Sequence, residues 1–345
     1  MPTYSLVVPA YNEEGVIEEL VAHLGAVMAS LDGDAEAILV DDGSTDRTWE
    51  LMQETATADP RFRLVRLSRN FGHQIALTAG MDLARGDAVV VMDADLQDPP
   101  EVVLEMAQRW REGYDVVYAV RSERQGETRF KRATASAFYR GFNRLSEVKV
   151  PLDVGDFRLV DRRALAVFSE MRESHRFVRG MFSWIGLSQT GVPYMRQERF
   201  AGETKYPLRK MLRFATSGVI SFSSAPLRTA LNVGFVVSVL AFVLGIWSIV
   251  VKVGGFYNVP GWTSTILVVS FLGGIQLVVL GVIGEYIGSI HDEVKGRPLY
   301  VVGELEGFDA VPSLPPRAVV VPRNPRAPAT PSTSSASRPA PNSSG

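Results

Sequence analysis

The chain has no cysteine in its 345 residues, which excludes disulfide bonds and thiolate metal sites. Histidine is scarce as well, and its four copies, His23, His73, His175 and His291, are too scattered to suggest a zinc site. Neither sign of charge dominates, because 36 Lys and Arg stand against 38 Asp and Glu. The formal net charge of -2 gives no support to nucleic-acid binding.

Glycine-rich phosphate-binding motifs are also missing. The first predicted strand-to-helix turn, at residues 9–15, lacks the fingerprint of a dinucleotide site, and no Walker A sequence occurs in the chain. Any phosphate that the protein binds must therefore be held by other groups.

Two long apolar runs without charge are present, at residues 229–251 and 262–284. Each is long enough to cross a hydrocarbon core of ~30 Å. A buried core helix is the alternative for either run alone, but two such runs joined only by residues 252–261 favour membrane helices. Basic residues flank the pair on both sides, at Lys205, Arg209, Lys210, Arg213, Arg228, Lys295 and Arg297. The positive-inside rule then predicts a multi-pass protein of the cell membrane, with its large N-terminal domain and both termini in the cytoplasm.

Strand and helix patterns alternate through the first third of the chain. The predicted strands lie at 4–8, 37–40, 62–67, 88–92 and 114–120. The predicted helices begin near Asn12, at Gln74 and at Pro99-Pro100, and the last of them reaches about Glu112. This alternation predicts an α/β fold with a doubly wound, mostly parallel sheet.

The apolar run 88–92 ends abruptly in Asp93, Asp95 and Asp98. Open α/β sheets bind ligands at the carboxyl ends of their strands, and two aspartates one residue apart offer oxygens suited to Mg²⁺ or Mn²⁺ with a substrate diphosphate. Walker B strands, phosphoacceptor strands and solvated strand ends share this pattern.

Asp41 and Asp42 follow the strand at 37–40 in the same way. Carboxylates in this position accept hydrogen bonds from ribose hydroxyls or a base N–H. A capped turn, in which Ser44 or Asp46 serves the next helix, is the alternative. We favour the binding role because the preceding strand is apolar throughout.

Three segments in this order, 8–13 (VPAYNE), 40–46 (VDDGSTD) and 92–100 (MDADLQDPP), resemble glycosyltransferase family 2 with its GT-A nucleotide-sugar fold. The resemblance covers roughly residues 3–302. It is closest to the polyprenyl-phosphate branch, which includes dolichol-phosphate mannosyltransferase and the bactoprenol glucosyltransferases with paired C-terminal transmembrane helices. It implies an inverting, metal-dependent enzyme that moves one sugar from a nucleotide-sugar to a polyprenyl phosphate and so makes a lipid-linked donor for the cell envelope. UDP-glucose is the expected donor, and GDP-mannose is the alternative.

The resemblance also implies roles for individual residues. The donor nucleotide-sugar would be held by Pro9, Ala10, Tyr11, Glu13, Asp41, Asp42, Asp93, Ala94 and Arg121. Mg²⁺ or Mn²⁺ would be bound by Asp95, Asp93 and Gln97. The catalytic set would be Asp95, Asp156, Arg199 and Lys205.

Cations for the acceptor phosphate are expected at Arg199, Lys205 and Lys131. Arg199 and Lys205 belong to the family-like segment 199–206, in which Thr204 replaces a frequent Ser. A basic cluster that serves only membrane topology is the alternative. Lys131 lies in the basic amphipathic segment 129–145, which suits either an anionic acceptor or membrane surface, or a core-facing helix with a solvated face.

Asp156 lies at the start of a predicted strand, near the reacting centre in the family. A polyprenyl phosphate has its second pKa near ~6, so at neutral pH it is already an ionised nucleophile. The harder task is to stabilise the departing nucleoside diphosphate. We therefore expect Asp156 to orient the acceptor or the sugar and to act at most as a weak base.

The predicted organisation has a GT-A domain at 1–200, a juxtamembrane interfacial segment at 201–228, transmembrane helices at 229–251 and 262–284, a cytoplasmic post-membrane segment at 285–311 and a disordered Pro/Ser/Ala-rich tail at 312–345. The expected partners are the donor, the polyprenyl phosphate and the bilayer, with no nucleic acid. Small residues in and just after the second run, at Gly273, Gly274, Gly281, Gly284 and Gly288, would allow a dimer or tetramer. A flippase is a further expected partner.

Two other function classes compete with this interpretation. Phosphoaspartyl transferases of the haloacid-dehalogenase type also place Asp-x-Asp after a buried strand, but they expect Thr or Val where Gln97 stands and carry their acids on the first strand. A non-catalytic nucleotide-sugar binder, or a scaffold for a flippase, is the other class. The intact set of Asp93, Asp95, Asp156, Arg199 and Lys205 argues against it.

Overall fold

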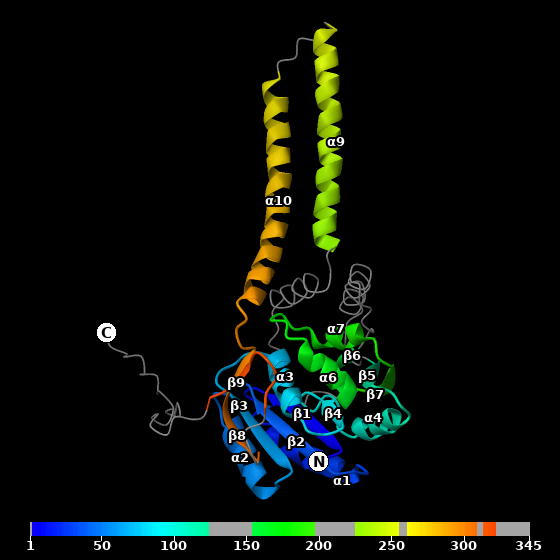
Figure 1. Ribbon diagram of the computed structural model, residues 1–345, viewed down its shortest axis with the longest axis vertical. Coiled ribbons are helices and arrows are strands. Elements are labelled where there is room, and N and C mark those ends of the chain that lie inside the picture. The colour runs from blue at the N-terminus through cyan, green and yellow to red at the C-terminus, as the bar shows by residue number, and fades with distance from the viewer. Residues whose placement is uncertain (1, 124–153, 197–224, 255–260, 309–312, 322–345) are drawn as a thin grey trace, which may run out of the picture.

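The computed structural model describes residues 2–123, 154–196, 225–254, 261–308 and 313–321. A mixed sheet at one end of the molecule is covered by helices on both faces, and two long helices project away from it (Figure 1). In the described residues the sheet has nine strands in the order β7-β5-β6-β4-β1-β2-β3-β8-β9. Their bounds are Tyr4–Ala10 (β1), Ala35–Asp41 (β2), Phe62–Leu67 (β3), Ala88–Val91 (β4), Val116–Glu123 (β5), Val154–Asp161 (β6), Gln189–Met195 (β7), Tyr300–Glu306 (β8) and Ala318–Val320 (β9).

The centre of the sheet is parallel, as the alternation of strands and helices predicts. Strands β4, β1, β2 and β3 run in one direction, whereas β6 is antiparallel to both β4 and β5, and β8 is antiparallel to β3. The apolar run at β4 is buried on both faces, because Val90 packs into one core and Val89 and Val91 into the other. A central strand covered on both sides needs no alternation of apolar and polar residues, which explains its sequence.

The helices divide between the two cores. They span Ile17–Ser30 (α1), Thr48–Ala58 (α2), His73–Leu83 (α3), Val102–Arg111 (α4), Arg162–Glu170 (α6), Val178–Ile185 (α7), Ala225–Val253 (α9) and Trp262–Val294 (α10). Helices α1, α2 and α4 contribute residues to one core, and α3, α6 and α7 contribute to the other. The two helices that approach the candidate site, α3 and α7, therefore lie on the same face of the sheet.

The prediction of a helix beginning near Asn12 is wrong, since α1 begins at Ile17. Asn12 has a left-handed backbone with φ 56°. Its N–H donates to Ser44 Oγ at 3.0 Å and its Oδ1 accepts from the Thr45 N–H at 2.8 Å. The side chain thus joins the loop after β1 to the loop after β2, and it caps no helix.

The predicted domain boundaries also need correction at the C-terminal side. Helix α10 continues to Val294, beyond the predicted end of the second span, and the chain then returns to the sheet. Strand β8 pairs with β3, so the N-terminal domain at 1–200 is incomplete without a segment that follows the membrane helices. Strand β9 pairs with β8 inside the tail that was predicted to be disordered from residue 312. The apolar stretch 318–321 (AVVV) is strand-forming, but the Pro and Ser content averaged over the whole tail hides it.

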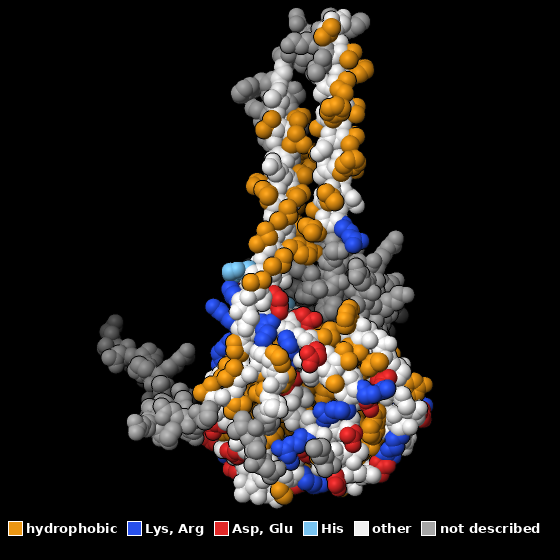
Figure 2. All heavy atoms as spheres, viewed as in Figure 1, with side chains coloured by type: hydrophobic (Ala, Val, Ile, Leu, Met, Phe, Trp, Pro, Cys, Tyr) orange, Lys and Arg blue, Asp and Glu red, His pale blue; other side chains and the backbone are white. Residues whose placement is uncertain are grey.

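Helices α9 and α10 present apolar side chains to their surroundings along most of their length (Figure 2). Leu227–Trp247 and Phe271–Val294 are candidate membrane spans by length and composition. Neither span is buried inside the protein. Phe235, Phe242 and Leu277 are 69%, 70% and 71% exposed. A core helix of a soluble domain would bury such residues, so this exposure favours membrane association.

Several predicted features lie outside the described residues. They are the basic helix at 129–145 with Lys131, the segment 199–206 with Arg199 and Lys205, residues 201–224 of the interfacial segment predicted at 201–228, and the tail beyond residue 321. Residues 225–228 of the predicted interfacial segment belong to α9.

Candidate active site

The acidic loops gather at one edge of the sheet because the strands that precede them are parallel neighbours. Strand β1 lies between β2 and β4, and its residue Ala10 is in register with Asp41 of β2. Pro9 and Ala10 are buried strand residues, whereas Tyr11 is 44% exposed in the loop that follows. The carboxyl ends of the three strands thus place residues 11–13, 41–46 and 92–98 at the same edge.

Asp41 and Asp42 already have structural partners. The buried Asp41 accepts a hydrogen bond from the Ser44 N–H at 2.9 Å and lies 3.2 Å from Arg66 Nε. Asp42 accepts from the Phe71 and Gly72 N–H groups at 2.7 and 2.9 Å. Burial raises the pKa of both carboxyls, and these hydrogen bonds oppose that effect. Both side chains shape the loops, and their contact with a nucleoside stays a prediction.

The acidic turn after β4 has a constrained backbone. Leu96 is left-handed with φ 54°, an uncommon conformation for a leucine, and the Gln97 N–H donates to Asp95 Oδ1 at 3.2 Å. Asp93 lies on the same turn, and its side chain is 29% exposed. The turn therefore holds Asp93, Asp95 and Gln97 within one short segment, as the metal-binding prediction requires.

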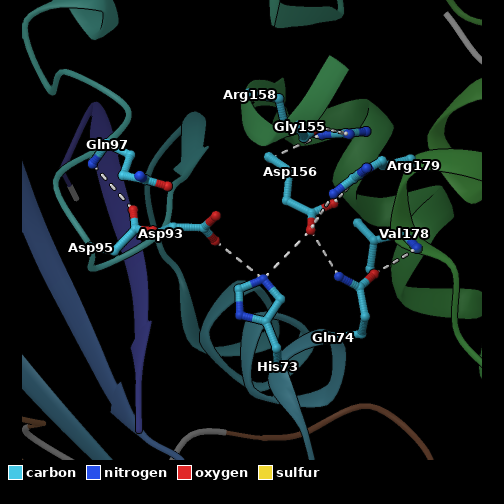
Figure 3. A network of polar contacts seen from close by, with 10 residues as sticks. All are labelled: His73, Gln74, Asp93, Asp95, Gln97, Gly155, Asp156, Arg158, Val178 and Arg179. Carbon is cyan, nitrogen blue, oxygen red and sulfur yellow. Dashed lines mark hydrogen bonds and ion pairs between the residues drawn. The ribbon is translucent and has the colours of Figure 1, made fainter. Parts of the chain in front are cut away.

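His73, the first residue of α3, stands between the acidic turn and Asp156 (Figure 3). Its Nε2 lies 3.2 Å from Asp93 Oδ1 and 3.5 Å from Asp156 Oδ2. Burial lowers the pKa of His73, but the hydrogen bonds and charges of the two carboxylates outweigh burial and raise its pKa above the ordinary value. His73 is therefore a cation at neutral pH, and it bridges two acids that would otherwise repel each other.

The carboxylate of Asp156 is surrounded by hydrogen-bond donors (Figure 3). Its Oδ1 accepts from Arg179 Nε at 2.9 Å, and its Oδ2 accepts from Gln74 Nε2 at 2.9 Å and Arg179 Nη2 at 3.2 Å. Burial would raise the pKa of Asp156, but the charge of Arg179 and the bonds from His73 and Arg179 hold it well below its usual value. A carboxylate so stabilised is a poor proton acceptor.

The backbone on which Asp156 stands is also fixed. Arg158, on the same strand, donates Nε to the Asp156 carbonyl at 3.2 Å and Nη2 to the Gly155 carbonyl at 3.0 Å. Its guanidinium lies over the Phe182 ring, 5.2 Å from the centroid. Burial lowers the pKa of Arg158 to about 10, so it remains charged at neutral pH.

Arg121 comes from β5, the strand next to β6. It donates Nε to Tyr194 Oη at 3.3 Å, and Tyr194 in turn donates to Asp98. A Cβ on Gly155 would lie 3.1 Å from Arg121 Nη2, so the guanidinium packs against the residue before Asp156. This position beside Asp156 suits the predicted contact of Arg121 with the donor.

The residues of the acidic turn fit a divalent cation. The Oδ1 atom of Asp93 is shielded from solvent and lies 3.2 Å from His73 Nε2, with which it forms an ion pair. The carboxylate oxygens of Asp93 and Asp95 and the amide oxygen of Gln97 are the kind of ligand that Mg²⁺ and Mn²⁺ prefer. In the described part of the chain, no group of three or more His, Cys, Asp or Glu side chains is arranged to hold a metal ion by itself. A cation held by Asp93, Asp95 and Gln97 would therefore need oxygens from a bound ligand, as a diphosphate supplies.

The structure thus brings together Asp93, Asp95, Gln97, Arg121 and Asp156 from three separate segments of the chain. Sequence reasoning missed three residues of this site, His73, Gln74 and Arg179. His73 and Gln74 begin a helix immediately after a predicted strand and loop, a placement that could have drawn attention to them. Arg179 follows no recognisable signal, because only the packing of α7 beside β6 brings it to Asp156.

Comparisons with known proteins identify the family and several relatives of this chain. The family model described as "Glycosyl transferase family 2" matches residues 5–168, and the model described as "GtrB C-terminal hairpin" matches residues 225–290. An uncharacterized glycosyltransferase of Bacillus subtilis (strain 168) is 49% identical over 89% of this chain and 95% of its own length. A prophage bactoprenol glucosyl transferase homolog of Escherichia coli (strain K12) is 40% identical over 86% of this chain and 97% of its own length. Among solved structures, mannosyl-3-phosphoglycerate synthase from Rubrobacter xylanophilus matches 63% of this chain and 72% of its own, with a TM-score of 0.46 and 19% identity.

The family models and the curated relatives confirm the predicted family, with its GT-A fold class, and the assignment as an enzyme. The two models cover different parts of the chain, the sheet domain and the helix pair, in the order that the sequence predicts. The relatives extend the similarity over 86–89% of the chain. The chain therefore belongs to glycosyltransferase family 2, in a form with an apolar C-terminal hairpin of the GtrB type.

Proposed function

We propose that this glycosyltransferase moves one glucose from UDP-glucose to a polyprenyl phosphate at the cytoplasmic face of the membrane, with inversion and with Mg²⁺ or Mn²⁺. The observation that carries the proposal is the bridge from Asp93 through His73 to Asp156, at the edge of a domain attached to two exposed apolar helices. Relatives named bactoprenol glucosyl transferase, 39–40% identical, support a lipid-linked phosphate acceptor.

In this proposal, different residues of the chain bind the two anionic substrates, the donor nucleotide-sugar and the acceptor phosphate. Asp95, Asp93 and Gln97 would hold the cation, which when bound supplies positive charge to the departing diphosphate. Arg121, beside Gly155, would contact the donor, and Asp41 and Asp42 would shape the nucleoside pocket next to the loop of Tyr11 and Glu13.

Asp156 acts in this proposal as an anchor and not as a base. The polyprenyl phosphate is mostly ionised above its second pKa of ~6, so its oxygen can attack the sugar without losing a proton to the enzyme. The low pKa of Asp156 agrees with this role. Asp156 pairs with Arg179 and His73. In this proposal these two cations would stabilise the charges of the donor and the acceptor.

Three further cations complete the proposal for the acceptor phosphate. Lys131, Arg199 and Lys205 lie outside the described residues, and their roles rest on the family resemblance and on their position before the membrane helices. We also propose, from the sequence and the family resemblance alone, that both termini lie in the cytoplasm, that the protein forms a dimer or tetramer and that a flippase is a partner.

The test is a donor panel on purified full-length protein in lipid nanodiscs. UDP-glucose, UDP-galactose, UDP-N-acetylglucosamine and GDP-mannose are each offered with a short-chain polyprenyl phosphate and Mg²⁺ or Mn²⁺, and the lipid-linked sugar is measured by mass spectrometry. We expect product with UDP-glucose that disappears with a chelator and in Asp95→Asn. Product with GDP-mannose alone would replace the donor assignment. A donor that binds and is never consumed would overturn the proposal in favour of a non-catalytic binder.

A further inference from the structure

The C-terminal end of α10 is hydrogen-bonded to the loop that leads into the candidate site. Glu293 lies in the last turn of α10, and its Oε2 accepts a hydrogen bond from the Ser174 N–H at 2.8 Å. Ser174 belongs to residues 171–177, the loop between α6 and α7. Charged side chains gather on the visible face at this end of α10 (Figure 2). We call residues 171–177 with Glu293 and Arg317 the α10 junction.

Arg317 connects three parts of the chain at this junction. Its Nη1 donates to Glu293 Oε1 and to the Arg172 carbonyl, each at 2.6 Å, and its Nη2 donates to Ser174 Oγ at 2.8 Å. Its Nε donates to the Arg297 carbonyl at 3.0 Å. An isolated exposed ion pair contributes little, but the Arg317 side chain is only 16% exposed and its guanidinium is shared among the membrane helix, the loop and the return segment.

The backbone of Arg317 has a left-handed conformation, with φ 64°. A non-glycine residue with an unbranched side chain adopts it at some cost, and it persists where surrounding contacts fix it. Here the Arg317 carbonyl also accepts from the Leu299 N–H at 2.6 Å. The residue is therefore held by its backbone as well as by its side chain, immediately before β9.

A second clamp fixes the far end of α3. Arg172 donates to Asp82 Oδ1 at 3.1 Å and to Oδ2 at 2.8 Å, and the Tyr300 hydroxyl donates to Asp82 Oδ2 at 2.8 Å. Arg172 and Asp82 are 7% and 0% exposed. The segment that follows the membrane helices thus contacts both α3 and the α6–α7 loop.

Helix α3 and helix α7, which follows the 171–177 loop, carry the residues that surround Asp156. Helix α7 begins at Val178, directly after the junction loop, and its next residue is Arg179. The Val178 N–H donates to Gln74 Oε1 at 3.0 Å, and Gln74 in turn donates to Asp156. A short, continuous path therefore runs from Glu293 through Ser174 to Arg179 and Asp156.

We infer that Arg317 and Glu293 are positioning residues for the transfer reaction: they fix the 171–177 loop between the membrane helix and α7, and so hold Arg179 on Asp156. The inference rests on the proposed function for its kinetic consequence. It assigns a role to a C-terminal segment that lies far from the acidic motifs in sequence. Among the described residues, Arg317 and Glu293 contact each other, Arg172, Ser174 and Arg297, so they are argued to act through the loop and not on the substrates.

The experiment is a double-mutant cycle in nanodiscs with the full chain. We compare Arg317→Gln, Arg179→Gln and the double variant, and we measure kcat and the KM for the nucleotide sugar. Misplacement of a catalytic group lowers the rate more than binding, so we expect kcat of Arg317→Gln to fall on the order of tenfold, with KM nearly unchanged. In the Arg179→Gln background, Arg317→Gln should cause no further loss, because the residue through which it acts is already gone.

Hydrogen exchange supplies a readout that does not depend on activity. Amides of α7 should exchange faster in Arg317→Gln than in the wild type. The matched control is Arg109→Gln, which removes an exposed arginine paired with Glu112 on α4 and should leave both kcat and the exchange of α7 unchanged. Glu293→Gln keeps an oxygen for the Ser174 N–H and loses only the charge, so it should give a smaller effect in the same direction. If Arg317→Gln does not fold, Glu293→Gln replaces it in the double-mutant cycle with Arg179→Gln.

The outcomes are separable. Unchanged kcat and unchanged α7 exchange, or the same fold loss of kcat in both backgrounds, would overturn the inference, since a merely structural role lowers yield or thermal stability without this epistasis. If the wild type makes no lipid-linked sugar, the proposed function fails. In that case faster α7 exchange in Arg317→Gln but not in Arg109→Gln still supports the junction, and its absence refutes it.

Discussion

Replacing Asp156 with asparagine separates an anchoring carboxylate from a catalytic base. The substitution keeps the size of the side chain and removes its charge. Arg179 donates two hydrogen bonds to this carboxylate, at 2.9 and 3.2 Å, and Gln74 donates one at 2.9 Å. An asparagine offers one oxygen and one NH₂ group, so part of this donor set would face another donor.

The magnitude follows from burial. Removing one partner of a fully buried ion pair costs about 3–5 kcal/mol. The side chains of Arg179 and His73 are 24% and 40% exposed, so solvent offsets part of the loss. We therefore expect Asp156→Asn to lower the free energy of unfolding by about 2 kcal/mol. That corresponds to a fall in Tm of roughly 4–8 °C for a domain of this size.

The pH dependence carries a definite sign. The pKa of Asp156 is depressed in the folded protein, so its contribution to stability is present above the ordinary pKa of an aspartate, ~3.9, and is lost as pH falls toward the folded value. The Tm difference between wild type and Asp156→Asn should therefore be full at neutral pH and shrink below about pH 4. Thermal scans monitored by tryptophan fluorescence at several pH values measure it.

Turnover gives the decisive comparison. We expect Asp156→Asn to reduce kcat on the order of a hundredfold through misplaced Arg179 and His73. The ratio of wild-type to variant kcat/KM should stay constant from about pH 9 to about pH 6, because the acceptor is already ionised over most of this range. A ratio that grows as pH falls through the acceptor's pKa of ~6 would show a true base and refute the reasoning. An unchanged Tm at neutral pH would refute the anchoring role.

Three further predictions test the site and the core. His73→Gln should lower kcat and also lower the concentration of Mn²⁺ needed for half-maximal activity, because a cation 3.2 Å from Asp93 no longer competes with the metal. His23→Gln, which removes a histidine paired with Glu19 on α1, is the control, and a higher Mn²⁺ requirement in His73→Gln would contradict the prediction. Asp95→Asn should weaken Mn²⁺ activation by at least about tenfold in a metal titration, and an unchanged titration would remove Asp95 from the metal site. Gly80→Ala should destabilise by about 1–3 kcal/mol in thermal denaturation, because its Cβ would overlap Val7 and lie 3.0 Å from Val40, whereas Gly25→Ala on α1 meets no atom within 4 Å and should not destabilise.

Much of the fold follows from local patterns. The apolar run at 88–91 and the alternation of strands and helices identify a sheet buried on both faces, because buried parallel strands need no polar side chains. Chain direction is harder to predict. Strand β6 has an ordinary strand pattern, and only its pairing with β4 and β5 shows that it runs antiparallel to both.

The positions of the acidic residues of the site can likewise be predicted from the sequence. Asp93 and Asp95 must lie at the edge of the sheet because they directly follow a central strand, and parallel neighbours bring Asp41 and Asp42 to the same edge. The position of each of these aspartates depends only on the few residues that connect it to the end of its strand. The motifs also suffice to identify the family, since each lies within one such connection.

Only the tertiary structure decided which cations accompany these acids. Arg179 reaches Asp156 because α7 packs beside β6, and His73 reaches both Asp93 and Asp156 because Asp42 holds the loop before α3. The segment after the membrane helices joins the sheet at β3 and brings Arg317 to Glu293, although the tail's composition predicted no structure there. The sequence by itself therefore determined the family, the strand-end acids and the apolar helix pair. The tertiary structure decided the charge partners of Asp156 and the link to α10, because contacts between distant segments depend on packing that no local pattern encodes.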